Sequence, residues 1–357
     1  MTYNREQPYN ALPDLPPKVN LETIATLKKN ITASRALAQL NGSLQKLPNP
    51  FLFIDTLHLK EAKASSEIEN IITTNDELYQ SIIGDKKLNN LEAKEVLRYK
   101  DALWLGIKKL EDRPFLTTNL FIEIVQLIKN NTAGIRKTTG TSLKNNEGIV
   151  IYTPPEGEKI IREKLGKLET FINNDNNLDP LIKMAVMHYQ FEAIHPFFDG
   201  NGRTGRILML LYLKLAGLLD HPILFFSEYI IQNKSDYYAN LREITEQNNW
   251  ENWVMYMLDM VEKTANRGIE LINKVNETFN QLNEDIKSEL PKLHSKELVE
   301  TLFSLPYLKR QVLVNKGFGT LKTTGNYLNA LEKKGFLNSK MIGKEKIYIN
   351  SALLKLL

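Results

Sequence analysis

Apolar residues recur at spacings of three and four along most of this chain, and this helical periodicity restricts the fold more than any other feature. Segments with the apolar–polar alternation of strands are few and short, so the sequence predicts a mainly α fold. We expect an extended leader to about Lys18 and helices over roughly 21–110. Further helices are expected from Thr118, over 180–194 and over 232–283.

The stretch HPFFDGNGRTGR, residues 195–206, joins two of these helices. Asp179 and Pro180 are a typical N-cap and first residue for the helix before it. That helix is expected to end near Ile194, because Pro196 disfavours a helical backbone at the residue before it. The segment after the loop is apolar on several faces, which predicts a buried central helix.

The glycines of this loop stand just ahead of the second helix, where free backbone N–H groups point back at the loop. Gly200, Asn201 and Gly202 allow a backbone that turns these groups into a concave anion site, and a helix N-terminus favours negative charge. Arg203 and Arg206 are three residues apart, so their guanidinium groups share one helix face. The loop therefore predicts a polyphosphate site.

Two more side chains of the loop add reactive chemistry. Asp199 offers hard oxygens suited to Mg²⁺ beside phosphate groups. His195 ordinarily has a pKa near neutrality, so its imidazole can take a proton from an attacking hydroxyl. These groups match phosphoryl or nucleotidyl transfer, and their spacing alone does not distinguish the two. The sequence lacks the P-loop pattern of Walker-type ATPases.

The composition limits the class of protein. The chain has no Cys, which excludes disulfides, thiolate catalysis and Cys-ligated zinc. Its first residues are polar and proline-rich, without the apolar segment of a secretory signal. No apolar run reaches the length of a membrane span, so we expect a cytoplasmic protein without membrane contact.

The loop resembles the signature of Fic-domain proteins, H-P-F-x-(D/E)-G-N-G-R-x-x-R, at every specified position. This resemblance implies a Fic-type helical core that transfers AMP from ATP, with Mg²⁺, to a Tyr, Ser or Thr hydroxyl of a target protein or of the chain itself. It implies His195 as the general base, Asp199 as the Mg²⁺ ligand and Phe197 as a core residue. The nucleotide-binding residues expected in the loop, with Arg206 on the γ-phosphate, are His195, Gly200, Asn201, Gly202, Arg203, Thr204, Gly205 and Arg206.

The segment ASSEIENIITT resembles a second pattern of that family, the inhibitory motif (S/T)-x-x-x-E-(G/N), at Ser65, Glu69 and Asn70. Ser65 and Glu69 lie one helical turn apart and share a face. The resemblance implies that Glu69 pairs with Arg206 in the nucleotide site and takes the place of the γ-phosphate, so the enzyme is autoinhibited. A solvated helix residue is the alternative for Glu69. Removal of AMP from modified targets is a further role that the resemblance allows.

Two more assignments follow from the resemblance. Residues 140–155 break the helical pattern and correspond to a β-hairpin flap that aligns the target by strand addition, with an ordinary surface loop as the alternative. Gln232, Tyr237 and Tyr238 are candidates for the adenine pocket, although tyrosines here also suit core packing. The remaining histidines lack the mutual spacing of metal ligands and are expected to be structural. These are His58, His188, His221 and His294.

The basic charge of the chain is concentrated near its C-terminus. The net charge is +4, and residues 306–357 hold ten Lys or Arg against Glu332 and Glu345. Helices, a turn and a hairpin that reverses at Gly343 are typical of a winged helix-turn-helix, with 320–334 as recognition helix. Its expected buried face is Leu321, Leu328 and Leu331, its outward face Lys322, Thr323, Asn326 and Asn329, and its wing carries Lys340, Lys344 and Lys346. DNA and a protein partner remain alternatives for this surface.

We therefore expect four regions along the chain. These are an N-terminal helical region with the inhibitory helix (1–110), a catalytic core (111–270), a linker helix (271–290) and the winged helix (291–357). An intact His195 favours an enzyme over the alternative, a DNA-binding regulator that uses the core as a nucleotide sensor. The sequence identifies neither the target nor the oligomeric state, and leaves a homodimer open.

Overall fold

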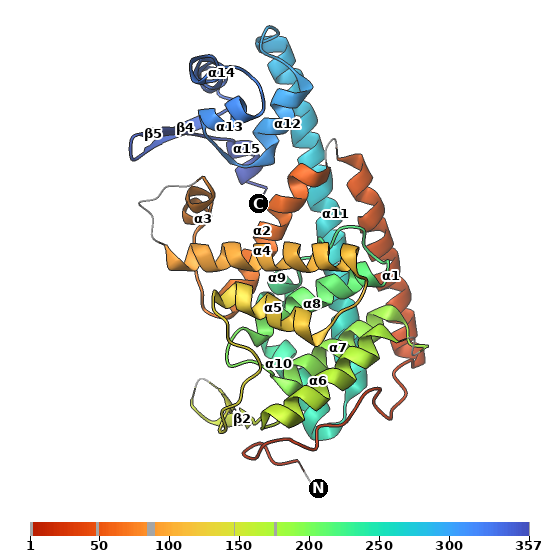
Figure 1. Cartoon of the computed structure of the whole chain (residues 1–357). Coiled ribbons are helices and arrows are strands. Elements are labelled where there is room, and N and C mark those ends of the chain that lie inside the picture. The colour runs from red at the N-terminus through yellow and green to blue at the C-terminus, as the bar shows by residue number, and fades with distance from the viewer. Residues whose placement is uncertain (1–2, 48–49, 84–89, 146, 175–176, 357) are drawn as a thin grey trace.

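The computed structural model of the chain describes residues 3–47, 50–83, 90–145, 147–174 and 177–356. The fold is mainly helical, as predicted (Figure 1). The helices ahead of the C-terminal part are α1 (Ile24–Ser43), η1 (Leu44–Lys46), α2 (Pro50–Ile68), α3 (Asn75–Ile82), α4 (Leu91–Asp112), α5 (Thr118–Lys129), α6 (Glu158–Asn173), α7 (Pro180–Ile194), α8 (Asn201–Leu215), α9 (Phe226–Gln232), α10 (Lys234–Gln247) and α11 (Trp250–Glu289). Among the described helices, none is both long and apolar enough to span a membrane.

The centre of the larger, lower part of the molecule is the pair α7 and α8. Both are buried along almost their whole length, and they pack against each other. α1, α6 and α11 also pack on α7, whereas α2, α4 and α5 pack on α8. Asp179 caps α7 and Pro180 is its first residue, as predicted. The loop between α7 and α8 is thus held at both ends by the protein core.

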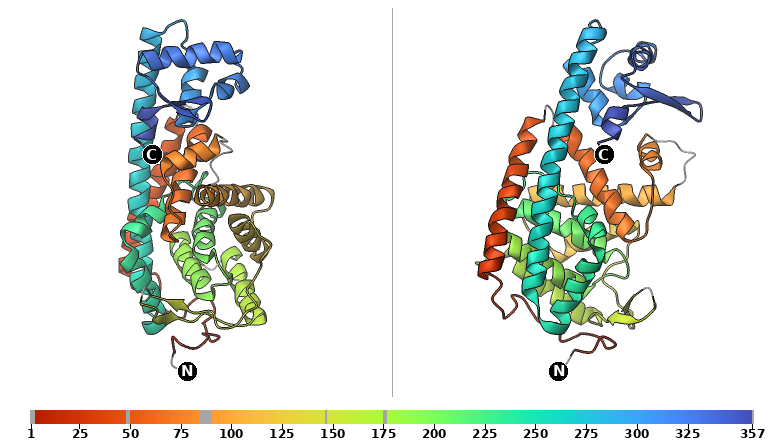
Figure 2. Two further views of the ribbon diagram at one scale, coloured as in Figure 1. Left: turned by 90° about the vertical axis from the view of Figure 1, so that its left-hand side faces the viewer. Right: turned by 180° about the vertical axis from the view of Figure 1, so that it is seen from behind.

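α1 lies beside the long α11 along one edge of the molecule (Figures 1 and 2). Lys29 of α1 pairs with Asp259 and Glu262 of α11 at 2.6 and 2.7 Å. Farther along, a Cβ on Gly268 would lie 2.8 Å from Leu40 Cδ1, so the helices approach closely. α11 continues without a break toward the C-terminal part, so the boundary expected at 270 falls inside one helix.

The C-terminal part is a small module of helices and one sheet at the far end of α11 (Figure 2). Its elements are α12 (Lys296–Ser304), β3 (Tyr307–Leu308), α13 (Arg310–Asn315), α14 (Leu321–Lys333), β4 (Asn338–Ile342), β5 (Glu345–Ile349) and α15 (Ser351–Leu354). The strands pair antiparallel in the order β3-β5-β4. Leu328 and Leu331 are buried, as predicted. The prediction for Leu321 is wrong: it is 53% exposed, because it is the first residue of α14 and lies beyond the packed stretch.

The segment expected as a flap does form an antiparallel hairpin, of β1 (Leu143–Lys144) and β2 (Val150–Tyr152). The extended leader packs against the base of this hairpin. The Tyr9 N–H donates to the Thr153 carbonyl at 3.0 Å, and the Thr153 hydroxyl donates to the Arg5 carbonyl at 2.7 Å. The leader therefore holds the segment that leads from the flap to α6.

Candidate active site

The loop between α7 and α8 turns sharply twice. His195 ends α7 with φ 47° and ψ 60°, in the left-handed region, and Gly200 precedes α8 with φ 84°. A Cβ at Gly200 would also lie 2.9 Å from Val125 Cγ2, so this position needs glycine for both reasons. The Asn201 side chain accepts from the Phe197 N–H and donates to the Phe197 carbonyl, both at 2.8 Å. These two hydrogen bonds join residues 197 and 201 and stabilise the turn between α7 and α8.

The aromatic residues of the loop have opposite environments. Phe197 is buried and contacts Phe191 of α7, which agrees with the core role expected for it. Phe198, the next residue, is 80% exposed. Sequence reasoning gave Phe198 no role, since it stands at a position that the family pattern leaves free.

His195 is held through its backbone by an arginine that the sequence did not single out. Arg136 donates from Nε to the His195 carbonyl at 2.8 Å and from its N–H to the Pro196 carbonyl at 2.9 Å. It also donates to the Pro155 carbonyl at the end of the flap. Burial, helped by the Arg136 charge, lowers the pKa of His195 to about 4. The expected near-neutral pKa is thus corrected: the imidazole is neutral at pH 7.

The Arg206 side chain points away from solvent to α2, where it meets the candidate inhibitory motif. Its Nε donates to Ser65 Oγ at 2.8 Å, and its Nη2 donates to the Ser65 carbonyl at 2.9 Å and to Glu69 Oε1 at 2.8 Å. The predicted pairing of Glu69 with Arg206 is therefore present. Burial alone would raise the pKa of Glu69, but Arg206 holds it below its usual value, so the carboxylate is ionised.

The end of α2 explains the third residue of the motif. Asn70 adopts φ 61°, a left-handed conformation that Asn and Gly accept more readily than other residues. Its N–H donates to the Glu67 carbonyl at 3.0 Å and so closes the helix. Glu69 consequently lies in the turn directly after α2, against the start of α8. A Cβ on Gly202 would lie 2.5 Å from Glu69 Oε1, which leaves no room there for a side chain.

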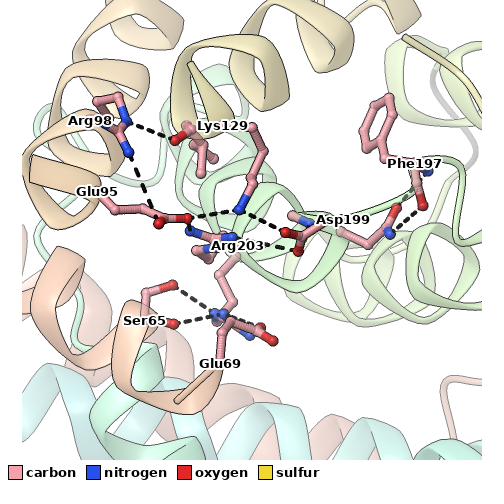
Figure 3. A network of polar contacts seen from close by, with 12 residues as sticks. Ser65, Glu69, Glu95, Arg98, Lys129, Phe197, Asp199 and Arg203 are labelled. Carbon is pink, nitrogen blue, oxygen red and sulfur yellow. Dashed lines mark hydrogen bonds and ion pairs between the residues drawn. The ribbon is translucent and has the colours of Figure 1, made fainter. Parts of the chain in front are cut away.

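Arg203 does not share the environment of Arg206, although the two are close in sequence. Figure 3 shows Arg203 directed toward Glu95 of α4 and toward Asp199. Its Nη1 donates to Glu95 Oε1 at 2.5 Å, and its Nη2 lies 3.6 Å from Asp199 Oδ1. Lys129, the last residue of α5, lies 2.9 Å from Glu95 Oε1 and 2.6 Å from Asp199 Oδ2. Arg203 and Lys129 thus share two carboxylates.

Asp199 is the residue of this group that suits a metal ion. Its side chain is 56% exposed, and its Oδ1 accepts from the Gly200 N–H at 2.6 Å. Burial would raise the pKa of Asp199, but Lys129 and Arg203 hold it below its usual value. Within the described residues no cluster of three or more His, Cys, Asp or Glu side chains could enclose a metal. A single carboxylate fits Mg²⁺ that takes its other oxygens from a nucleotide and water.

The remaining positions of the loop pack into the protein. Thr204 is fully buried. A Cβ on Gly205 would contact Glu192 of α7 and lie 3.2 Å from Phe191 Cδ1, so glycine allows α7 and α8 to approach. Burial raises the pKa of Glu192 to about 7. The sequence gave no sign of this buried carboxyl.

Two of the three adenine candidates are neighbours, and the third lies elsewhere. Tyr237 is buried, and its hydroxyl is 2.8 Å from His188 Nε2. Tyr238 is 45% exposed, and its ring centroid lies 5.2 Å from that of Tyr237. Gln232 lines a cavity of about 210 Å³ between α2, α3 and α9, and this cavity includes no residue of the loop.

The expected structural role of the other histidines agrees with their surroundings where contacts are described. His58 is buried with Nε2 3.1 Å from the Pro222 carbonyl, and His294 Nε2 is 2.9 Å from Asn283 Oδ1. Burial lowers the pKa of His188 to about 3.

Three family models match the chain. "Fic/DOC family N-terminal" matches residues 27–108, "Fic/DOC family" matches 115–213, and "Protein adenylyltransferase SoFic-like, C-terminal domain" matches 278–353. The first of these contains the Ser65–Glu69 segment, and the second contains the whole loop. Together the matches cover most of the sequence.

Two curated relatives are named protein adenylyltransferases. The chain is 26% identical over 179 residues to "Protein adenylyltransferase Fic" of Drosophila mojavensis, which is 49% of this chain and 34% of that protein. It is 27% identical over 201 residues to a probable protein adenylyltransferase of Aquifex aeolicus, 54% of this chain and 57% of the relative. The chain thus spans between a third and three-fifths of the length of these relatives.

Solved structures share the fold over longer stretches. A Fic family protein from Desulfovibrio desulfuricans superposes with a TM-score of 0.58 at 21% identity, over 94% of this chain and 98% of the other. Fic-1 of C. elegans gives a TM-score of 0.53 at 18% identity, over 70% and 73% of the two chains. With a signature loop of this geometry and family matches along most of its length, the chain belongs to the Fic/DOC family.

Proposed function

We propose that the chain is a protein adenylyltransferase, which transfers AMP from ATP to a Tyr, Ser or Thr hydroxyl of a target protein or of the chain itself. The printed names of the curated relatives support this reaction. The main observation behind the proposal is the ion pair between the Glu69 carboxylate and the Arg206 guanidinium, which lies at the first turn of α8. An anion of this chain already lies where backbone N–H groups and a guanidinium favour phosphate.

His195 is the proposed general base. The target oxygen attacks the α-phosphorus and forms a new P–O bond, while the bond to the oxygen of the β-phosphate breaks and pyrophosphate leaves. The imidazole takes the proton of the hydroxyl. Because its pKa is lowered to about 4, a nitrogen lone pair is free to accept that proton at neutral pH. Arg136 fixes the residue through its backbone carbonyl.

Asp199 is the proposed Mg²⁺ ligand. Bound there, Mg²⁺ would neutralise charge on the phosphates of ATP. Among the protein's own groups, Arg206 is the proposed partner of the terminal phosphate, and Gly200 to Gly202 are proposed to contact the nucleotide through their backbone. Arg203, which is almost completely buried, orders the first turn of α8 by bridging Glu95 and Asp199.

The same contacts support autoinhibition by Glu69. As long as the Glu69 carboxylate is paired with Arg206, the γ-phosphate of ATP cannot bind the Arg206 guanidinium and is repelled by the negative charge of Glu69. ATP then binds only in a pose unsuited to attack by the target hydroxyl. Ser65 contributes by holding the guanidinium in the orientation that faces Glu69.

The test is labelling of protein by ATP that carries a label on the α-phosphate, with Mg²⁺. We expect Glu69→Gly to raise labelling at least about tenfold, because the guanidinium becomes free for phosphate. His195→Ala should abolish labelling with Glu69 intact or replaced. Glu67→Gly is the matched control, since Glu67 lies on the same helix and forms no described pair with Arg206.

Two results would make the proposal wrong. One is a Glu69→Gly protein that binds ATP yet labels neither itself nor any protein of a whole lysate. The other is a His195→Ala protein that still labels. Removal of AMP through Glu69 stays an alternative. It predicts that a labelled target loses its AMP only in the presence of protein with Glu69 intact.

DNA binding by the C-terminal module is the second alternative, and the structure favours it less. Lys340 of the wing pairs with Asp76 of α3, and Lys346 pairs with Glu332 at 2.5 Å. Two of the wing lysines proposed for phosphate contact therefore already have acidic partners within the chain. A protein-contact role is more consistent with a module that docks on α3.

A further inference from the structure

A lysine lies against the carboxylate that is the proposed metal ligand. Lys129 Nζ is 2.6 Å from Asp199 Oδ2 and 2.9 Å from Glu95 Oε1, so one ammonium group bridges two carboxylates (Figure 3). The other oxygen of Asp199 accepts from the Gly200 N–H. Both oxygens of the Asp199 carboxylate thus have a partner within the chain.

The position of Lys129 is built into the fold. It is the last residue of α5, which ends at Asn130 with φ 51°. Its side chain is 23% exposed, and a Cβ on Gly200 would lie 3.6 Å from its Cγ and Cδ atoms. The aliphatic stem therefore runs past the loop glycine, and only the ammonium group reaches Asp199. The packed aliphatic stem of Lys129 therefore limits the positions that its ammonium group can reach.

Glu95 gives the ammonium group a second carboxylate partner. Its carboxylate also accepts from Arg203 and lies 4.0 Å from Arg98 Nη2. Burial would raise the pKa of Glu95, but Arg203 and Lys129 keep it below its usual value, so it is a charged partner. If Lys129 leaves Asp199, it is not left unpaired.

We propose that Lys129 neutralises Asp199 through an ion pair as long as no metal–nucleotide complex is bound. When such a complex binds, the ammonium group leaves Asp199 and keeps its ion pair with Glu95. This inference rests on the proposed function, because it assumes that Asp199 binds Mg²⁺ together with a nucleotide. A divalent ion bound by Asp199 would repel the ammonium group that lies against the same carboxylate, so the lysine and the metal compete for Asp199. Because of this competition, Mg²⁺ strengthens nucleotide binding less than it would in a protein without the Lys129 ammonium group.

The consequence is a measurable coupling between metal and nucleotide. Without metal, Lys129 shields the phosphates from the negative charge of Asp199. Replacing Lys129 exposes that charge, which weakens nucleotide binding in the absence of metal. With Mg²⁺ present, the competitor is gone and binding is unchanged or tighter. The ratio of the two dissociation constants therefore rises when the lysine is removed.

The experiment measures binding of ADP by calorimetry in EDTA and in Mg²⁺. ADP is used because it has no γ-phosphate to meet Glu69. We expect Lys129→Met to raise the ratio of Kd in EDTA to Kd in Mg²⁺ at least about fivefold over the wild type, a typical lower value for coupled sites. Lys129→Arg retains the charge and should leave the ratio near that of the wild type.

Lys109→Met is the matched control. Lys109 of α4 pairs with Glu123 of α5 at 2.9 Å, so it too links these helices, but it contacts neither Asp199 nor Glu95. This variant should keep the wild-type ratio, and circular dichroism should confirm that all the variants are folded. A structural role of Lys129 would lower affinity equally with and without Mg²⁺ and leave the ratio unchanged.

The outcomes separate this inference from the proposed function. An unchanged or smaller ratio in a folded Lys129→Met protein that still binds ADP overturns the role of Lys129 alone. A wild-type protein that binds neither ADP nor ATP, with or without Mg²⁺, overturns the proposed function and this inference with it.

Discussion

Arg206 is the single side chain on which most of the account depends. It is almost completely buried, and each of its described contacts leads to Ser65 or Glu69. A buried guanidinium needs an anion beside it, because desolvation of an unpaired charge is costly. Glu69 supplies that anion, so in the proposed reaction a γ-phosphate would have to displace Glu69 to reach Arg206.

His195 gives a prediction for the pH dependence of the reaction. Its lowered pKa of about 4 keeps the imidazole neutral from pH 6 to pH 8. A base with the ordinary pKa of about 6.5 would lose roughly three-quarters of its active form at pH 6. We expect the initial labelling rate of the Glu69→Gly protein to change less than about twofold over this range. A fall of that larger size between pH 8 and pH 6 would contradict the neutral base.

The sequence predicted the loop residues, and the resemblance to the family predicted Glu69 as the partner of Arg206. The partners of Asp199 and Arg203 were not predicted. Local rules were enough to place His195 at the end of α7 and Gly200 before α8, because Pro196 and the glycines act on neighbouring backbone. Glu95 and Lys129 were missed. They come from α4 and α5, and no spacing in the sequence connects them to Asp199.

The pair α7 and α8 shows how helix packing positions the site. Both helices are buried on nearly every face, so the surrounding core determines where the loop lies. Gly205 lets α8 approach α7, and α2 then presents Ser65 and Glu69 to Arg206. Helical periodicity predicted these helices, but it could not predict which of them pack together.

Gly205→Ala tests this close packing. The added Cβ would contact Glu192 and lie 3.3 Å from His188 Cε1, so we expect a loss of about 1–3 kcal/mol in the free energy of unfolding, as for other overpacked cores. Gly166→Ala in α6 is the control. Nothing lies within 4 Å of its Cβ, and alanine should stabilise that helix by about 0.5–1 kcal/mol. Equal effects in urea unfolding would contradict the proposed contact.

Across the protein as a whole, the C-terminal module is joined to the N-terminal helices by two routes. One is the continuous helix α11 (Figure 2). The other is a direct contact, in which Tyr307 of β3 stacks on Tyr79 of α3 with 5.3 Å between ring centroids, and Asp76 accepts from both Tyr307 and Lys340. α3 begins five residues after Asn70, so the module contacts the helix that follows the candidate inhibitory segment. The helices and hairpin of this module followed from the sequence. Its docking on α3 did not, because that contact joins residues more than 200 positions apart.

Asp76→Asn tests that contact. Removing one charge should weaken the bond to Lys340, and we expect faster hydrogen exchange in α3 and in β4–β5. Global stability should change by no more than about 1 kcal/mol, since exposed ion pairs contribute little. Glu111→Gln is the control, because Glu111 pairs with Lys214 far from the module, at 3.6 Å. Equal exchange in the wild type and in Asp76→Asn would show that the module is held by other contacts.

The most direct test of the account is the intact mass of the Glu69→Gly protein after incubation with ATP and Mg²⁺. The account predicts one or more additions of the mass of an adenylyl group, and none when His195→Ala is added to the same protein. Additions of the mass of a phosphate, or adenylyl additions that persist without the imidazole, would contradict it.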